Sequence, residues 1–449
     1  MDKVKELEAM DKLFDRLFPI CRSITGEGLR ETIEILSEYM PLEVFGEPTG
    51  KQAFDWEIPK EWVIRDGWLK APDGRKLADF KSSNLQILNY STPVQTKLSL
   101  AELEGHLFSI PHLPEAVPYV TSYYKERWGF CLPHCEREQL VEGEYEAYID
   151  SEHIDGELNY AHSVLPGETD REVLISTYIC HPSMANNELS GPLVAAFLYN
   201  RIAKWSKRRY TYRFVFVPET IGSIAYLHRF GTEMKQNTQA GLVLTCLGGP
   251  EPLNYKLSRS GANPLDHIWQ QLLERGELEG KTRPFTPAFG SDERQYCSPG
   301  FNLPVGQMAR TVYGLYDGYH NSLDTKEAMT IEALQRSVEE LERLLELNEA
   351  EGYYVNRSPY GEVKLDKHGL YPDINSPINR SQSSNEVMDN RRQLNIILTI
   401  LNYADGEHTL TEIAELCRSS IAAILPFIEQ LKEKGIIEGP YAEKGRLFK

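Results

Sequence analysis

The sequence predicts an α/β protein in which helices flank a mixed sheet, with an inserted mostly-β domain and a C-terminal winged helix-turn-helix. Three observations predict this class. β-prone runs alternate with helical runs over residues 166–351. Short aromatic and β-branched runs, separated by Pro, Gly and Asp, fill residues 46–165. Residues 386–449 have the pattern of three helices followed by a small β wing.

The N-terminal residues predict two helices. Apolar side chains recur at helical spacing from Lys3 to Met40, and Gly26 and Gly28 separate the two runs. Such helices need a core to pack on, so we expect residues 1–45 to join residues 166–351 in one α/β domain. Residues 46–165 are then an insertion into that domain.

After Asp170 the pattern predicts strands that alternate with helices, as in a parallel or mixed sheet covered on both faces. The expected strands are 173–179, 210–217, 241–246 and 304–308, and the expected helices are 189–205, 223–230, 264–274 and 330–349.

Residues 352–385 are rich in Pro, Gly, Asn and Ser and predict a linker. In the winged helix that follows, helices are expected over 390–401, 409–417 and 420–434, with the wing at 436–438 and 446–448. The expected recognition helix has no Arg or Lys before Lys432, and residues 386–449 hold ten acidic and eight basic residues. Base readout normally needs such cations, so we expect an interaction or dimerisation module, with a possible homo-oligomer, and no nucleic acid partner.

Composition excludes several classes of protein. The 449 residues carry 48 Lys and Arg against 66 Asp and Glu, a net charge of −18 that repels phosphate backbones and anionic lipid. No long apolar run predicts a membrane span, and the charged N-terminus does not resemble a signal peptide. The seven cysteines are scattered without the spacing of a disulfide framework. We therefore expect a cytoplasmic protein with reduced thiols and no membrane partner.

Titratable side chains follow four expected strands or the turns next to them. In open α/β sheets, functional residues gather at the carboxyl ends of the strands. Two histidines and several carboxylates at one edge are what a zinc hydrolase needs, because imidazole and carboxylate bind Zn²⁺ and a nearby carboxylate accepts the proton of water. Each residue taken singly also has a structural explanation, such as helix capping by Asp324. The candidates are His181, Asn187, Glu188, Glu219, Asp292, Glu293 and His320.

These segments together resemble the zinc aminopeptidase superfamily, which also includes glutamate carboxypeptidases and glutaminyl cyclases. The segments that carry this resemblance are His181 with 187–191, 214–223, 291–293 and 319–325. Residues 17–26, 54–59 and the His181 segment further resemble an uncharacterised bacterial family. Its members are described as aminopeptidase-like, with an inserted β domain and a C-terminal winged helix, and this likeness extends over essentially the whole chain.

The resemblance implies roles for particular positions. His181 matches the first histidine ligand of the superfamily and His320 the last. Asn187 stands where the superfamily has a metal-bridging Asp, and the adjacent Glu188 is an alternative ligand. Glu219 alone represents a catalytic pair of glutamates, so it is either the general base or a ligand.

Other ligand positions of the superfamily have changed. The Asp ligand expected after the following strand falls near Thr245 and Cys246, so it is absent unless Cys246 takes its place; Asp292 or Glu293 could supply the missing oxygen. This set is too small for two zinc ions.

We expect one zinc ion instead, and its ligands stay open. One set is His181, His320 and a carboxylate from Glu188, Glu219 or Asp292. The second set, after the glutaminyl cyclases, is Asn187, Glu219 and His320. Complete loss of the metal is the third possibility.

The expected function is metal-dependent hydrolysis of an amide or peptide bond in a small molecule or peptide. Glu219 would be the catalytic base, and Tyr319 or Tyr316 would bind the oxyanion. Relatives with surface-polysaccharide functions would favour an amine-bearing or sugar-linked substrate. The alternative is a non-catalytic binding or scaffold protein on the same fold that recognises an amino sugar or an amino acid.

Overall fold

The computed structural model describes residues 3–261, 263–371 and 384–445, with no side chains described for 384–389. The chain forms two compact units. The first comprises Met1–Asn263 and Gly280–Glu342, and the second comprises Pro264–Glu279 and Arg343–Lys449. None of the helices in the described part of the chain combines the length and apolarity that a membrane crossing requires.

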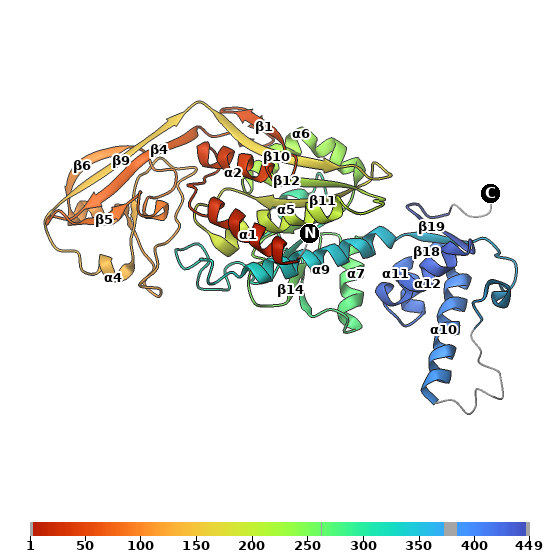
Figure 1. The fold of residues 1–449 in the computed structure, drawn as a ribbon. Helices are drawn as coiled ribbons and strands as arrows, with labels where there is room; N and C mark the ends of the chain where they lie inside the picture. The colour runs from red at the N-terminus through yellow and green to blue at the C-terminus, as the bar shows by residue number, and fades with distance from the viewer. Residues whose placement is uncertain (1–2, 262, 372–383, 446–449) are drawn as a thin grey trace. The chain divides into compact units, whose positions relative to one another are not determined.

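The first unit is built on an eight-stranded mixed sheet, which confirms the predicted fold class (Figure 1). Its middle strands are parallel to one another, and strands β11 and β12 are buried along their whole length, as expected of a sheet covered on both faces. In spatial order the strands are β1 (Glu43–Pro48), β10 (Glu157–Leu165), β12 (Thr211–Val217), β11 (Glu172–Tyr178), β13 (Thr238–Leu244), β16 (Val305–Ala309), β14 (Leu253–Lys256) and β15 (Gly280–Arg283).

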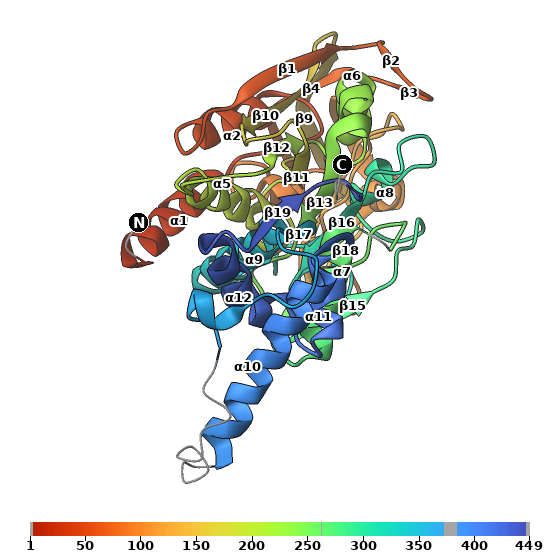
Figure 2. The ribbon, with the colours of Figure 1, turned by 90° about the vertical axis from the view of Figure 1, so that its right-hand side faces the viewer.

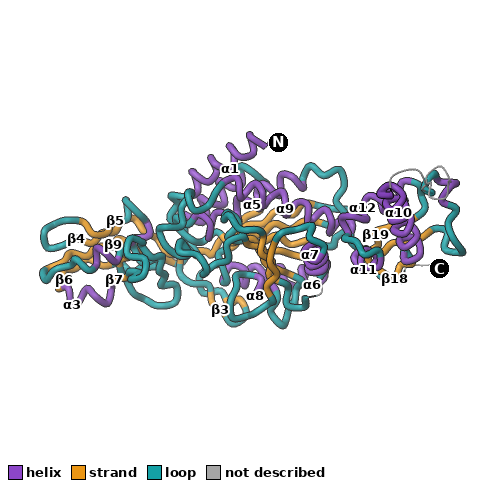
Figure 3. Tube along the Cα trace, turned by 90° about the horizontal axis from the view of Figure 1, so that it is seen from below, coloured by secondary structure: helices purple, strands orange, loops and turns teal. Residues whose placement is uncertain are grey.

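Helices cover both faces of this sheet (Figures 2 and 3). Helices α1 (Lys3–Leu17), α5 (Ser190–Ile202) and α9 (Ile331–Ala350) lie on one face, and α6 (Ile221–Asn237) and α8 (Glu293–Tyr296) lie on the other. Helix α2 (Glu27–Ser37) packs near β10. The start of α5 approaches the sheet closely because its second residue is a glycine. A Cβ at Gly191 would lie 2.1 Å from Thr177 Oγ1 and 2.6 Å from the Leu244 carbonyl oxygen.

The inserted part has its own four-stranded antiparallel sheet and its own apolar core. The strand order is β5 (Lys76–Asp79), β4 (Glu61–Lys70), β9 (Glu144–Ile154) and β6 (Val94–Ser99). The flanking strands β1 and β10 pair with each other in the central sheet. The inserted sheet is therefore narrower than the predicted boundaries of 46–165, because β10 continues from β9 into the α/β core.

Shorter elements complete the insertion. They are the paired strands β2 (Gln52–Ala53) and β3 (Trp56–Glu57), the paired strands β7 (Leu107–Phe108) and β8 (Phe130–Cys131), the helices α3 (Leu100–Leu103) and α4 (His134–Arg137), and the 3-10 turns η1 (Asn84–Gln86) and η2 (Glu104–His106).

The second unit contains the predicted winged helix. Strand β17, at the start of the predicted linker, pairs with β19, at the expected first wing strand, and with β18, which the sequence pattern did not predict. Residues 372–383 of that linker, and the expected wing strand 446–448, lie outside the described residues. The elements are α7 (Pro264–Glu274), β17 (Tyr353–Asn356), η4 (Leu365–His368), α10 (Ser384–Tyr403), β18 (Asp405–Thr409), α11 (Leu410–Leu416), α12 (Ile421–Glu433) and β19 (Ile437–Tyr441).

Helix α7 packs against the winged helix inside this unit through one buried side chain. The Gln271 side-chain amide donates to the Thr411 carbonyl at 3.1 Å and to Glu415 at 2.6 Å, and its oxygen accepts the Ile421 N–H at 2.7 Å. All three polar positions on Gln271 are thus occupied by groups of α11 and α12 or their caps.

Candidate active site

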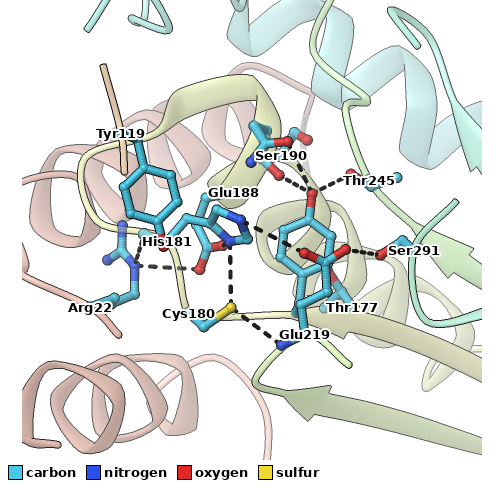
Figure 4. A network of polar contacts seen from close by, with 12 residues as sticks. Arg22, Tyr119, Thr177, Cys180, His181, Glu188, Ser190, Glu219, Thr245 and Ser291 are labelled. Atoms are coloured by element: carbon cyan, nitrogen blue, oxygen red, sulfur yellow. Dashed lines mark hydrogen bonds and ion pairs between the residues drawn. The ribbon is translucent and has the colours of Figure 1, made fainter. Parts of the chain in front are cut away.

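The carboxyl ends of the parallel strands bring the expected site residues to one edge of the sheet (Figure 4). Cys180 and His181 directly follow β11, and Glu219 lies between β12 and α6. Cys246 follows β13, and His320 lies in the loop after β16. The four loops thus converge because their strands are neighbours and point the same way.

His181 is fixed by a carboxylate on one ring nitrogen and faces Glu219 with the other. Its Nδ1 lies 3.0 Å from Glu188 Oε2 and 3.4 Å from Cys180 Sγ, and its Nε2 lies 3.8 Å from Glu219 Oε2. Burial lowers the pKa of His181, but Cys180 and the Glu188 carboxylate outweigh burial and raise the pKa well above its usual value. A carboxylate on Nδ1 is the arrangement that orients a metal-binding histidine and leaves Nε2 for the ion.

Glu188 also pairs with a buried arginine from the N-terminal segment. Arg22 Nε lies 3.4 Å from Glu188 Oε1 and donates to the His181 carbonyl oxygen at 2.9 Å, and neither side chain of the ion pair is exposed. Arg22 thus supports the position of His181 through both its backbone and its carboxylate partner.

One compact ligand group comprises Cys180, His181 and Glu188, whose candidate atoms all lie within 4.8 Å of one another. Two features disfavour a cation there. The carboxylate already pairs with Arg22, and burial raises the pKa of the Cys180 thiol to about 11, which keeps it protonated near neutral pH. We therefore regard the Nε2 side of His181 as the functional side.

Glu219 is held by the loop that precedes α8. Its Oε1 accepts the Ser291 hydroxyl at 2.6 Å, and its backbone N–H lies 3.2 Å from Cys180 Sγ. The Glu219 side chain is 28% exposed, so a substrate or a water molecule can reach the carboxylate.

Asp292 lies beneath the Glu219 turn. Its Oδ1 accepts the Thr220 N–H at 2.7 Å and the Ser223 hydroxyl at 2.8 Å, while its buried Oδ2 has no hydrogen-bond partner among the described residues. Burial, and next the charge of Glu219, raise the pKa of Asp292 to about 8. In this position Asp292 supports the turn that presents Glu219.

The neighbouring Glu293 is occupied elsewhere. It forms a fully buried ion pair with Lys256, with 2.7 Å between Nζ and Oε1. That pair leaves Asp292 as the acid of this loop that lies nearest to Glu219.

His320 lies beside His181 with its ring available. The two imidazole centroids are 5.2 Å apart, and the Tyr319 ring stacks on His320 at 4.0 Å. Burial, together with the charge of His181, lowers the pKa of His320 to about 3. The imidazole of His320 is therefore neutral at physiological pH, as a metal ligand must be.

The two expected tyrosines have different surroundings. Tyr316 O–H is 3.4 Å from Asp324 Oδ2. No hydrogen bond of the Tyr319 hydroxyl occurs among the described residues, so Tyr319 is the one whose O–H is free to meet a substrate.

Asn187 lies in a neutral polar network. Its side-chain oxygen is 3.4 Å from Tyr178 O–H and 3.9 Å from Cys246 Sγ, and Tyr178 also bonds to Thr245 at 2.6 Å. Its Nδ2 is buried and has no partner among the described residues. Burial raises the pKa of the Cys246 thiol to about 12, so this network lacks an anion near neutral pH.

Asp324 caps a distant helix. Its two carboxylate oxygens accept the N–H groups of Asn186 and Asn187, each at 2.8 Å. These residues belong to η3 (Ala185–Leu189), a single π-helical turn before α5. The local pattern predicted a cap for the helix that follows Asp324. The carboxylate instead holds the His181 loop to the His320 loop, and π-turns are frequent at functional sites.

Several site loops adopt strained backbone conformations. Ser183, Thr220, Cys246 and His320 have φ between 44° and 65°, the left-handed region that side-chain-bearing residues rarely adopt. Each belongs to a different strand-end loop. Such strain concentrates at functional sites, where the surrounding structure holds it in place.

The inserted domain supplies a site residue that the sequence analysis missed. The Tyr119 ring lies 5.2 Å from that of His181 and 5.3 Å from that of His320, and its N–H donates to the His320 carbonyl oxygen at 2.8 Å. Its hydroxyl bonds to that of Tyr123 at 2.6 Å. Tyr119 carries no local signal of this role, because only the fold brings the insertion to the sheet edge.

The chain is similar in sequence to known families and proteins. Residues 11–351 match the model of a family described as a domain of unknown function, DUF4910, and residues 352–439 match a winged helix-turn-helix model. A Clostridium acetobutylicum protein, provisionally named a polysaccharide biosynthesis protein with an aminopeptidase-like domain, is 40% identical over 402 residues, which span 90% of this chain and 89% of that protein.

Solved structures show the same fold. A crystal structure of a provisionally named peptidase from Clostridium acetobutylicum has a TM-score of 0.86 and 36% identity, over 97% of this chain and 98% of the other. A zinc aminopeptidase from Bacillus subtilis has a TM-score of 0.56 and 12% identity, over 76% of this chain and 94% of the other. At that identity the second likeness shows the fold alone.

Proposed function

The chain belongs to the DUF4910 family, and a relative of 40% identity is named for an aminopeptidase-like domain; from this premise we propose that the chain is a zinc-dependent hydrolase of an amide or peptide bond. The observation that carries the proposal is the convergence of His181, Glu219 and His320 at the strand ends. Carboxylate support of one histidine and the neutrality of the other add to it.

The donor set fits one zinc ion. His181 through Nε2, His320, and the side-chain oxygen of Asn187 would hold it. His320 and Asn187 are neutral, whereas the raised pKa of His181 means that the ion would displace a proton from Nε2. A second ion does not fit, because Glu219 stands alone where the superfamily resemblance places two glutamates, and Cys246 stands where it places an Asp. Glu188 pairs with Arg22, and Asp292 bonds to Thr220 and Ser223. Both acids therefore hold other site residues in place and are not among the proposed ligands.

Glu219 is the proposed proton acceptor. When bound, the zinc would make its coordinated water acidic near neutral pH and polarise the scissile carbonyl. Ser291 donates to Oε1 of Glu219, which leaves Oε2, on the His181 side, to take a proton from water and pass it to the leaving amine. Tyr319 O–H is the proposed donor to the developing oxyanion.

The proposed substrate is an amide in a small molecule or a peptide that bears an amine or is linked to a sugar. The name of the Clostridium relative refers to polysaccharide biosynthesis, which supports a sugar-linked amide. We place the protein in the cytoplasm.

We also propose that the winged helix has a role in oligomerisation. We do not propose DNA binding, because the start of α12 is covered within its own unit. There Ser420 bonds to Glu277 at 2.6 Å, and Ile421 N–H bonds to Gln271.

The first experiment is metal analysis of protein purified without a metal-affinity tag. We expect about one zinc per chain, a loss of zinc in His181→Ala and His320→Ala, and retention in Glu219→Gln, which should still abolish hydrolysis of amide substrates. His112→Ala, at an exposed position, is the matched control. Absence of zinc from the wild-type protein, even after zinc is supplied, would overturn the proposal.

One observation favours a second candidate function. Asn187 and Cys246 are uncharged where a two-metal peptidase needs carboxylates, and a site with fewer anions is typical of a fold that has kept binding and lost catalysis. On this alternative the site recognises an amino sugar or an amino acid. It predicts ligand binding without turnover in zinc-loaded protein.

A further inference from the structure

Arg294 is a half-buried cation with no carboxylate partner among the described residues. Its Nε donates to the Ser291 carbonyl oxygen at 3.1 Å, and no other side-chain bond of its guanidinium occurs in the described part of the chain. Buried cations nearby are paired with acids, as in Arg22 with Glu188 and Lys256 with Glu293. In a chain with 66 acidic residues, an unpaired guanidinium beside a candidate active site calls for a ligand.

Arg294 lies next to the residue that holds Glu219. Ser291, whose carbonyl oxygen receives its Nε, gives its hydroxyl to Glu219. The guanidinium is therefore close to the loop that holds the proposed proton acceptor.

We propose that Arg294 binds an oxyanionic group of the substrate, a carboxylate or a phosphate, next to the bond held at Glu219. A guanidinium presents parallel N–H donors that match either oxyanion in a bidentate manner. The net charge of −18 repels anions from the surface of the protein, so anion binding would be limited to places with a local cation such as Arg294. The inference rests on the proposed function, because it assumes that the substrate reacts beside Glu219.

Binding to metal-free, full-length protein tests the proposal without turnover. Zinc is removed first because carboxylates and phosphates also bind zinc. The probes are succinate, succinamate and succinamide, which have similar size and two, one and no negative charges, together with inorganic phosphate. Isothermal titration gives their affinities for wild-type protein, Arg294→Gln, Arg294→Lys and Arg259→Gln. Arg259 is an exposed arginine bonded to Asn302 at 2.8 Å and serves as the matched control.

We expect the wild-type protein to bind at least one of the anionic probes ten-fold or more tightly than succinamide. Arg294→Gln should abolish this preference, Arg294→Lys should keep part of it, and Arg259→Gln should keep all of it. The tighter of succinate and phosphate identifies the oxyanion. Equal binding of charged and neutral probes by wild-type protein, or an unchanged preference in Arg294→Gln, would overturn the inference.

Failure of the proposed function gives a different result. A zinc-loaded protein that hydrolyses no amide, yet loses anion binding in Arg294→Gln, would refute the hydrolase and leave the anion site in place. Circular dichroism of each variant checks that the fold is retained, and Arg294→Lys provides a second test should Arg294→Gln fail to fold.

Discussion

Glu188 lies 3.0 Å from Nδ1 of His181 across a turn of seven residues, and both side chains are buried. The contact fixes the imidazole in the orientation that turns Nε2 toward Glu219. Arg22 completes the arrangement from the opposite side of the carboxylate. A charge buried so completely is stable only with its partner, so the pair can be tested through the stability of the fold.

Replacement of Arg22 by Met should lower the free energy of unfolding by about 3–5 kcal/mol, because Glu188 would be left buried without its counter-ion. The double variant Arg22→Met/Glu188→Gln should lose less than the two single variants together, with a coupling above about 1 kcal/mol. Urea denaturation of all four proteins measures this cycle. Arg16→Met breaks the exposed pair with Glu38 and should change stability little. Additive losses in the cycle would show that the buried pair does not act as a unit.

Asp292 predicts a pH-dependent stability in metal-free protein. Burial and the charge of Glu219 raise the pKa of Asp292 to about 8, whereas the same carboxyl in the unfolded chain has its ordinary pKa of 3.8. The native carboxyl therefore keeps its proton between these values, and its contribution to stability is lost as the pH rises from about 4 to about 8. Asp292→Asn keeps an acceptor for Thr220 and Ser223 and has no charge to bury.

Denaturation curves at several pH values check this sign. Between pH 6 and 8 the wild-type protein should lose stability relative to Asp292→Asn by up to about 1.4 kcal/mol per pH unit. Asp317→Asn, at an exposed position, should follow the wild-type protein. Parallel curves for wild type and Asp292→Asn would mean that the native carboxyl ionises normally.

The sequence pattern predicted which strand ends meet at the edge of the sheet better than it predicted which side chains are in contact there. His181, Glu219 and His320 follow strands whose apolar runs are long enough to recognise, so their convergence follows from the parallel topology. Arg22 and Tyr119 reach the same edge from segments that precede β11 in the chain. No periodicity encodes such a contact, because it depends on how distant segments pack.

Capping shows the same limit of local patterns. Asp324 precedes a helical region and was expected to cap it, yet its carboxylate serves Asn186 and Asn187 about 137 residues away. N–H groups near Asp324 in the chain and N–H groups brought there by the fold are alternative donors to that carboxylate. Only the three-dimensional arrangement decides which of them it meets.

Gln271 predicts that α7 and the winged helix unfold together. Gln271→Leu removes three hydrogen bonds and leaves the buried Ile421 N–H without its acceptor, which should cost about 1–3 kcal/mol. Gln270→Leu, one position earlier on α7, is the matched control. Hydrogen exchange should show faster exchange at Ile421 and along α12 in Gln271→Leu alone. Unchanged protection of α12 would show that α7 is not required for the stability of the winged helix.

Tyr119 tests whether the inserted domain is part of the site. Tyr119→Ala removes a ring that contacts both histidines, so the imidazoles lose their orientation, and zinc affinity should fall by about 10–100-fold, the usual cost of losing support around metal ligands. Tyr119→Phe keeps the ring and loses only the bond to Tyr123, so its zinc affinity should stay within about three-fold and its stability within about 1 kcal/mol of wild type. Competition with a fluorescent zinc chelator measures both affinities. If Tyr119→Ala bound zinc as tightly as wild type, the insertion would cover the histidines without orienting them.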